Sequence, residues 1–485
     1  MKNLKNITFT TATMVVPLAV SVVTVPFYLD KIGAERYGAL AIAWLLLGYF
    51  AQADFGIGRA VTQRISAMRK DERRPGAAAK VVWSATLLAS LIGVASAALI
   101  YVFAGYFFTN LFEVEEQVLA ELRSALILLA VSGPVVNVFS VATGALLGLE
   151  KVRGVAVLKM GNQLSLQLFP LLAAYLIDIK LQTLIAAALA GRILTMLPAC
   201  VLVWRALLSG LPVAASRADI RRLANFGAWI MVSSIVSPLM VISDRFVIGA
   251  VAGAVAVAAY TIPFQIASRT MVLPYAIMHV LFPQLAGLSG EEARQRAKQA
   301  LVAMGTVFAP AMIGLVVLAE PLLVLWLGER LDPRSALIGQ IVLVGWWSNS
   351  LAQVPFGLIQ AQGNPRFTAT LHVVELPAYV LALWGLGSAF GLPGMAAAFS
   401  IRCLVDFFAL AAKARVLSPE ILLRLLPSAV LIAVAFVAGQ KLTDPWTCLA
   451  LASFLAGLGA LWSWQVLPPA VKAQILAAAR LPDRA

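Results

Sequence analysis

The chain has 485 residues, of which 61% are apolar and 12% are charged. Soluble domains carry about a quarter charged residues, so this composition excludes an ordinary soluble protein. The formal net charge of +14 does not indicate nucleic-acid binding, because the basic residues lie in short loops between long apolar runs.

The apolar runs predict an all-α polytopic membrane protein with about fourteen transmembrane helices, since each run is long enough to cross a hydrocarbon core. The first run follows Lys2 and Lys5 as a signal peptide would, but it is too long for a signal core and no cleavage site follows it. We therefore interpret it as a retained helix. The three cysteines show no metal-ligand spacing, and no cofactor is predicted. The predicted spans cover residues 7–29, 38–58, 81–103, 124–148, 155–177, 182–204, 225–249, 256–282, 299–319, 336–360, 368–390, 393–412, 425–440 and 446–467.

The distribution of Lys and Arg predicts that both termini are cytoplasmic. With this orientation, the inner segments hold 25 of the 37 Lys and Arg residues, the outer loops hold seven, and five lie within the spans. The loop after the second span carries seven basic residues between Arg59 and Lys80. No loop exceeds about 25 residues, which leaves no room for a soluble catalytic domain. By contrast with the inner loops, the loop after the third span is acidic, with Glu113, Glu115, Glu116 and Glu121.

Three pairs of similar stretches indicate an internal repeat. Val15–Val20 resembles Val236–Val241, Gly144–Leu158 resembles Gly357–Leu371, and Ile185–Arg205 resembles Met395–Arg415. The displacements are 221, 213 and 210 residues, and the third aligns Arg192 with Arg402. We therefore predict two six-helix lobes in pseudo-twofold repeat around a central cavity, with an extra C-terminal helix pair. The predicted borders are 1–208, 209–415 and 416–485.

Three arginines lie near the middle of predicted spans, namely Arg192, Arg269 and Arg402. Charged groups at this depth are rare and usually face a bundle interior or a watery cavity. A guanidinium group fits phosphate oxygens, so these residues are candidates for binding an anionic headgroup. The alternative is that each arginine pairs with a carboxylate or with carbonyl groups and only braces its lobe. Arg402 has a candidate carboxylate partner, because Asp406 lies four residues further along on the same helical face.

Other charged residues in spans are candidates for gating or coupling. Asp244 and Arg245 are adjacent, so we expect them to point to different sides of their helix and to brace the lobe interface. Asp54 precedes Gly56 and Gly58, a pattern that we interpret as close helix packing with a gate contact to a cytoplasmic arginine. His372 and Glu375 share one helical face and would either bind a proton during transport or satisfy each other as a buried pair.

The order and spacing of several short stretches resemble the polysaccharide (O-antigen, Wzx-type) flippases, and the resemblance covers essentially the whole chain. The stretches are Pro26–Leu29, Gly33–Gly38, Asp54–Gly58, Ser243–Gly249, Ala259–Tyr260, Leu281–Pro283 and Gly357–Arg366.

This resemblance implies membership of the multidrug/oligosaccharidyl-lipid/polysaccharide exporter superfamily, with two lobes that alternate access to the two membrane faces. It implies a flippase of the bacterial inner membrane, which moves undecaprenyl-diphosphate-linked oligosaccharides to the periplasmic leaflet. The implied partners are this substrate, membrane lipids and other membrane proteins of polysaccharide assembly.

Two other functions stay open at this point. A cation-coupled multidrug antiporter of the same superfamily is the nearer alternative, although such proteins usually need an acidic cavity and the first span has no carboxylate in its apolar core. A membrane polysaccharide polymerase or ligase is the other, but such enzymes typically carry a large external loop.

Overall fold

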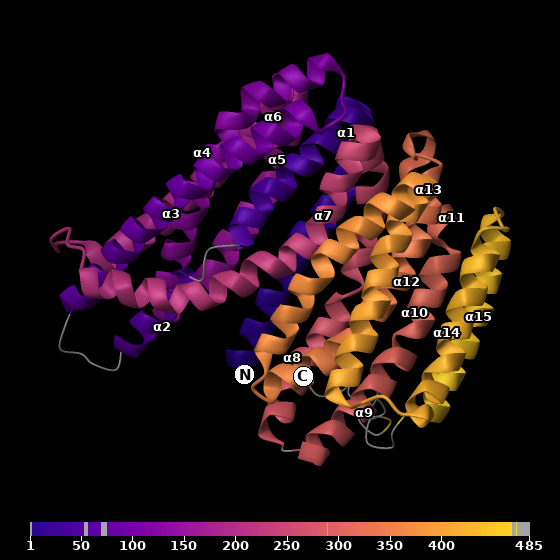
Figure 1. The fold of residues 1–485 in the computed structure, drawn as a ribbon. Coiled ribbons are helices and arrows are strands. Elements are labelled where there is room, and N and C mark those ends of the chain that lie inside the picture. The colour runs from indigo at the N-terminus through magenta and orange to yellow at the C-terminus, as the bar shows by residue number, and fades with distance from the viewer. Residues whose placement is uncertain (1, 53–56, 69–74, 289, 468–471, 473–485) are drawn as a thin grey trace. The chain divides into compact units, whose positions relative to one another are not determined.

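The structure is a computed structural model that describes residues 2–52, 57–68, 75–288, 290–467 and 472 (Figure 1). Within these ranges the chain is helical and contains no strand. Nine of the described helical segments are long and apolar enough to cross a membrane. The predicted class, an all-α polytopic membrane protein, is therefore confirmed.

Three very long helices each join two predicted spans, in whole or in part, through a turn at a single glycine. They are α1 (Lys2–Gln52), α7 (Arg217–Arg269) and α13 (Pro365–Ala414), and the turns lie at Gly33, Gly253 and Gly391. The φ angles are 76°, 77° and 64°, which L-residues with a side chain rarely adopt. Gly33 and Gly253 also share an extended ψ, 168° and 179°. The first turns of the two predicted lobes thus have the same backbone conformation.

The remaining predicted spans match single helices or adjacent helix pairs, with ends that shift by several residues. Two short helices, α2 and α11, lie mostly in segments that the span prediction leaves as loops, 59–80 and 320–335. The helices are α2 (Ile57–Met68), α3 (Pro75–Asn110), α4 (Glu116–Gly148), α5 (Val152–Leu176), α6 (Leu181–Val203), α8 (Val272–Gly287), α9 (Gly290–Val307), α10 (Ala309–Val317), α11 (Ala319–Leu327), α12 (Arg334–Ala361), α14 (Pro419–Gly439) and α15 (Pro445–Val466).

Three of these helices begin at a capping residue followed by proline. Asn364, Ser418 and Asp444 each accept a hydrogen bond from the backbone N–H three residues later. Proline at the first helical position loses nothing by lacking an N–H, because that group would have no partner inside the helix. The sequence pattern of cap and proline therefore fixes the starts of α13, α14 and α15.

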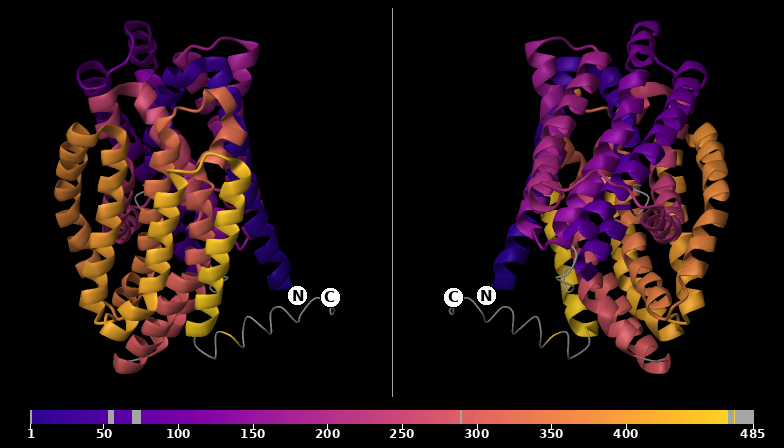
Figure 2. Two further views of the ribbon diagram at one scale, coloured as in Figure 1. Left: turned by 90° about the vertical axis from the view of Figure 1, so that its right-hand side faces the viewer. Right: turned by 90° about the vertical axis from the view of Figure 1, so that its left-hand side faces the viewer.

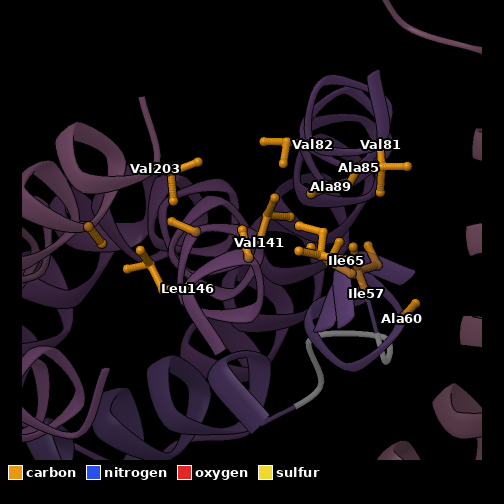
Figure 3. Packing of buried hydrophobic residues seen from close by; sticks show 14 of the residues in the cluster. Ile57, Ala60, Ile65, Val81, Val82, Ala85, Ala89, Val141, Leu146 and Val203 are labelled. Atoms are coloured by element: carbon orange, nitrogen blue, oxygen red, sulfur yellow. The ribbon is translucent and has the colours of Figure 1, made fainter. Parts of the chain in front are cut away.

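By packing, the chain divides into a first unit, Met1–Ala258, and a second unit, Ala259–Ala485. A hydrophobic core cluster of the first unit joins α2, α3, α4 and α6 through small and branched side chains (Figure 3). A Cβ on Gly144 would lie 2.4 Å from the Gly58 carbonyl oxygen, and Thr62 Oγ1 donates to the Gly144 oxygen at 2.9 Å. The close packing predicted at Gly58 is confirmed.

In the second unit, α14 and α15 lie side by side and pack against α10 (Figures 1 and 2, yellow). A Cβ on Gly459 would meet Ile313 at 3.1 Å, and Trp462 Nε1 donates to the Arg424 oxygen at 3.0 Å. The predicted C-terminal helix pair is therefore part of the second unit's packing. The lobe borders at 208 and 415 remain predictions.

Candidate functional site

Arg192 lies in α6 and is one of the most deeply buried side chains, with 1% of its surface exposed. Its Nη2 donates to the Leu47 carbonyl oxygen of α1 at 3.3 Å. Nε and Nη1 have no hydrogen-bond partner in the described part of the chain, and no carboxylate there forms an ion pair with this group. A buried charge without a counter-charge costs several kcal/mol. Two of the three guanidinium nitrogens of Arg192 therefore have no acceptor among the described residues.

Polar, uncharged side chains of α5 and α6 meet beside the backbone of Arg192. Asn162 Nδ2 of α5 donates to Thr195 Oγ1 at 3.0 Å, and the Thr195 hydroxyl donates to the Arg192 carbonyl oxygen at 2.9 Å. A Cβ on Gly191 would lie 2.7 Å from Ser165 Cβ, so α5 and α6 approach closely beside the arginine. These residues, Arg192 with Asn162, Thr195 and Gly191, form what we name the Arg192 site.

Arg402, in the second half of α13, has a different environment. Its guanidinium lies 5.3 Å from the Tyr379 ring centre and 5.4 Å from the Phe399 ring centre, and Nη2 donates to Cys403 Sγ at 3.3 Å. The predicted Arg402–Asp406 pair is wrong, because Asp406 lies 3.7 Å from His372 Nε2 instead. The aromatic rings hold the cation by the charge of their faces.

His372 and Glu375 of α13 lie close to Asp406, with one donor atom of each within 4.8 Å of the others. Glu375 and Asp406 are 8% and 6% exposed, and both Glu375 oxygens lack a hydrogen-bond partner among the residues described. The expected mutually satisfied His372–Glu375 pair is therefore not formed. We name His372, Glu375, Asp406 and Arg402 the Arg402 site. With a neutral imidazole it carries two carboxylates and one guanidinium, so a single positive charge would neutralise it.

Arg269 is the last residue of α7, and α8 begins three residues later at Val272. The span predicted from 256 to 282 is thus interrupted at its middle, and the Arg269 side chain is exposed. Broken helices of this kind are common where transporters bind their substrates. Asp54, the predicted gate residue, lies outside the described residues.

Asp244 and Arg245 of α7 were expected to point apart, and this prediction is wrong. Arg245 Nη1 lies 2.7 Å from Asp244 Oδ1 and 2.9 Å from Oδ2, with both side chains buried. The flexible arginine side chain folds back along the helix, because a buried charge needs a counter-charge more than it needs the usual helical direction.

A backbone seam in the first unit was missed by the sequence analysis. The Glu113 N–H donates to the Gly249 oxygen at 3.3 Å, and the Ala254 N–H donates to the Glu113 oxygen at 3.2 Å. A Cβ on Gly253 would lie 2.9 Å from the same Glu113 oxygen. The loop after α3 therefore closes on the Gly253 turn of α7, and we name this contact the 113–254 seam.

The carboxylate of Glu121 was also missed, since the sequence shows it only as part of an acidic loop. Arg36 donates to it from Nη2 at 2.8 Å and from Nε at 3.2 Å, and the Leu181 N–H donates to Oε2 at 2.9 Å. Glu121 thus ties the Gly33 turn of α1 to the start of α6. Its partners lie 85 and 60 residues away in the sequence, beyond the reach of pattern analysis.

Comparisons with known proteins agree with this fold. A family model described as "Polysaccharide biosynthesis protein" matches residues 3–289. A Shigella flexneri protein named "Putative O-antigen transporter" is 27% identical over 393 residues, which cover 81% of this chain and 92% of the relative.

Two solved structures share the fold at low sequence identity. The lipid II flippase MurJ in an inward closed conformation has a TM-score of 0.70 and 16% identity, with 94% of this chain and 98% of MurJ covered. An inward-facing multidrug resistance MATE family transporter of the MOP superfamily has a TM-score of 0.67 and 14% identity, with 84% and 97% covered. The predicted superfamily fold is confirmed.

Proposed function

The chain belongs to the polysaccharide biosynthesis protein family, and on this premise we propose that it is a flippase for lipid-linked oligosaccharides in the bacterial inner membrane. The support comes from the O-antigen transporter relative and from the shared fold with a lipid II flippase. Both relatives are transporters, and this chain is accordingly a transporter rather than a polymerase or ligase. We further propose an undecaprenyl-diphosphate-linked substrate and both termini in the cytoplasm.

The observation that carries this proposal is Arg192. It is buried in mid-helix, without a carboxylate partner in the described chain, and with two guanidinium nitrogens free of hydrogen bonds. A diphosphate headgroup would supply the missing acceptors and counter-charge. Arg269 at the helix break and Arg402 on its aromatic rings would add positive charge for the same headgroup. This is the cationic mechanism that the sequence analysis predicts.

We propose that the Arg402 site also couples transport to protons. Glu375 and Asp406 are buried near His372, and one proton shared among these groups would balance their charge against Arg402. Buried carboxylates also suit a cation-coupled multidrug antiporter, and the MATE-like fold makes this the second candidate. A cation-coupled antiporter, however, does not require a buried guanidinium without a counter-charge such as that of Arg192.

Alternating access requires a contact that opens and closes. We propose that the 113–254 seam closes the periplasmic side, because it joins two predicted outer turns by only two backbone hydrogen bonds. The aromatic cluster of Phe103, Phe107, Phe112 and Phe246 beneath it, with ring centres 5.0 to 6.2 Å apart, would exclude water while it is closed.

The test is complementation of a host that lacks its own flippase and is supplied with the matching polysaccharide genes. Arg192→Gln and Arg269→Gln are expected to abolish surface polysaccharide at normal protein abundance. The control is Arg205→Gln, at an exposed residue of the helical turn Trp204–Leu208 that follows α6. Normal polysaccharide in both variants would rule out the cationic mechanism. Drug efflux by the wild-type protein, without polysaccharide export, would favour the antiporter.

A further inference from the structure

A pocket of about 330 Å³ lies inside the first unit, between the first half of α1, the end of α4 and the first turns of α5. Beyond it, α1 and α5 are in contact, since Tyr28 donates to the Gln167 oxygen and Lys31 lies over the Tyr175 ring. The pocket wall is mainly apolar. Its apolar members are Pro17, Leu147, Val152, Val155, Ala156 and Met160, and its polar members are Thr13, Lys159 and Gln163.

Lys159 is the charged residue among those that line this pocket. It lies seven residues after the start of α5, which places it about 10 Å along the helix from Val152. Across the described chain, its ammonium group has neither an ion-pair partner nor a hydrogen-bond partner. Gln163 lies one helical turn further on the same face. A lysine within a membrane span is stable where its ammonium reaches the lipid headgroups or an anion.

We propose that this pocket binds one anionic phospholipid, with the phosphate on Lys159 and an acyl chain along the apolar wall. The volume lies at the lower end of the ~300–1,000 Å³ range of ligand sites, which suits one hydrocarbon chain rather than two. The predicted topology places the start of α5, with Lys151 and Arg153 beside it, on the cytoplasmic side. Basic pockets on that side, between transmembrane helices, attract anionic headgroups. None of the three arginines assigned to the transported headgroup lines this pocket.

The experiment uses the delipidated full-length protein in detergent and native mass spectrometry. The probes are phosphatidylglycerol, which is anionic, and phosphatidylcholine, which is zwitterionic. Lys159→Met is expected to weaken phosphatidylglycerol binding about fivefold, the factor that corresponds to ~1 kcal/mol for one basic residue, and to leave phosphatidylcholine binding unchanged. The matched control is Lys180→Met in the loop after α5, outside the pocket, which should behave as the wild type.

A second variant tests the apolar wall. Ala156→Trp fills the pocket and should weaken phosphatidylglycerol binding although Lys159 is intact; if this variant does not fold, Lys159→Met alone decides. Equal binding of phosphatidylglycerol to the wild type and Lys159→Met overturns the proposal. Undecaprenyl phosphate is the third probe. If it alone depends on Lys159, the occupant is a polyprenyl lipid and the phospholipid proposal is wrong. Loss of export in the arginine variants bears on the proposed function and leaves this result untouched.

Discussion

The Arg192 site and the Arg402 site occupy corresponding positions of the predicted internal repeat but differ in charge. The displacement of 210 residues aligns Arg192 with Arg402, and the displacement of 213 aligns Lys159 with His372 and Asn162 with Glu375. An amide and a hydroxyl lie beside the backbone of Arg192, whereas two aromatic rings lie against the Arg402 guanidinium and two carboxylates lie close to His372 in the same site. The two predicted halves therefore differ in the charged groups that lie near the matched arginine.

The largest expected difference between the two sites is in protein stability, because replacing Arg402 and replacing Arg192 should change the free energy of unfolding in opposite directions. Arg402→Met would leave the buried carboxylates Glu375 and Asp406 without the guanidinium charge of the Arg402 site, which we expect to destabilise the protein by ~3–5 kcal/mol. Arg192→Met removes a buried charge that has no counter-charge, so we expect it to be neutral or stabilising by ~1–4 kcal/mol. Thermal unfolding in detergent, followed by tryptophan fluorescence, measures both. Destabilisation of similar size in the two variants would mean that Arg192 only braces its lobe.

The second-largest expected effect is the loss of coupling between transport and protons when a carboxylate of the Arg402 site is replaced by a neutral amide. Glu375→Gln imitates a permanently protonated side chain, so net transport should fall about 100-fold, equivalent to ~2.7 kcal/mol, and should lose its dependence on pH. Asp406→Asn should act in the same direction. The measurement is flipping in reconstituted vesicles over a range of pH.

The matched control for these variants lies in the other half of the repeat. Asn162→Ala is expected to leave the pH profile unchanged, because the Arg192 site has no carboxylate among its described contacts. If the pH profile of flipping is unchanged in Glu375→Gln, the Arg402 site does not couple transport to protons.

The third difference concerns how closely the two helices approach at each arginine. Gly191→Ala would place a methyl group 2.7 Å from Ser165 Cβ, and such overpacking costs ~1–3 kcal/mol. The repeat counterpart is Ile401, whose side chain is half exposed. We expect Ile401→Ala to change stability by less than ~0.5 kcal/mol. Unfolding temperatures of the two variants test this, and equal losses would mean that the two helix pairs are packed alike.

The fold was largely predictable from the sequence, whereas the partners within each site were not. Span positions follow from runs of apolar residues, which depend only on local sequence and on membrane thickness. Ion pairs depend on which helices meet and on how long side chains bend. Helical spacing therefore paired Asp406 with Arg402, although His372 comes within reach from the other half of α13. Spacing also separated Asp244 from Arg245, although the arginine folds back.

The smallest expected difference lies in the hydrogen bond between Asn162 and Thr195. The repeat counterpart of Thr195 is Val405, an exposed apolar residue, so Thr195→Val makes the first site resemble the second. The Asn162 amide would then lose its acceptor, and we expect a loss of ~1 kcal/mol of stability. Thr195→Ser retains the hydroxyl and should retain most of the stability. Because the bond ties α5 to α6 beside Arg192, Thr195→Val should also weaken transport, whereas the reverse change Val405→Thr should affect neither. Equal unfolding temperatures of the valine and serine variants would show that this bond does not hold the two helices together.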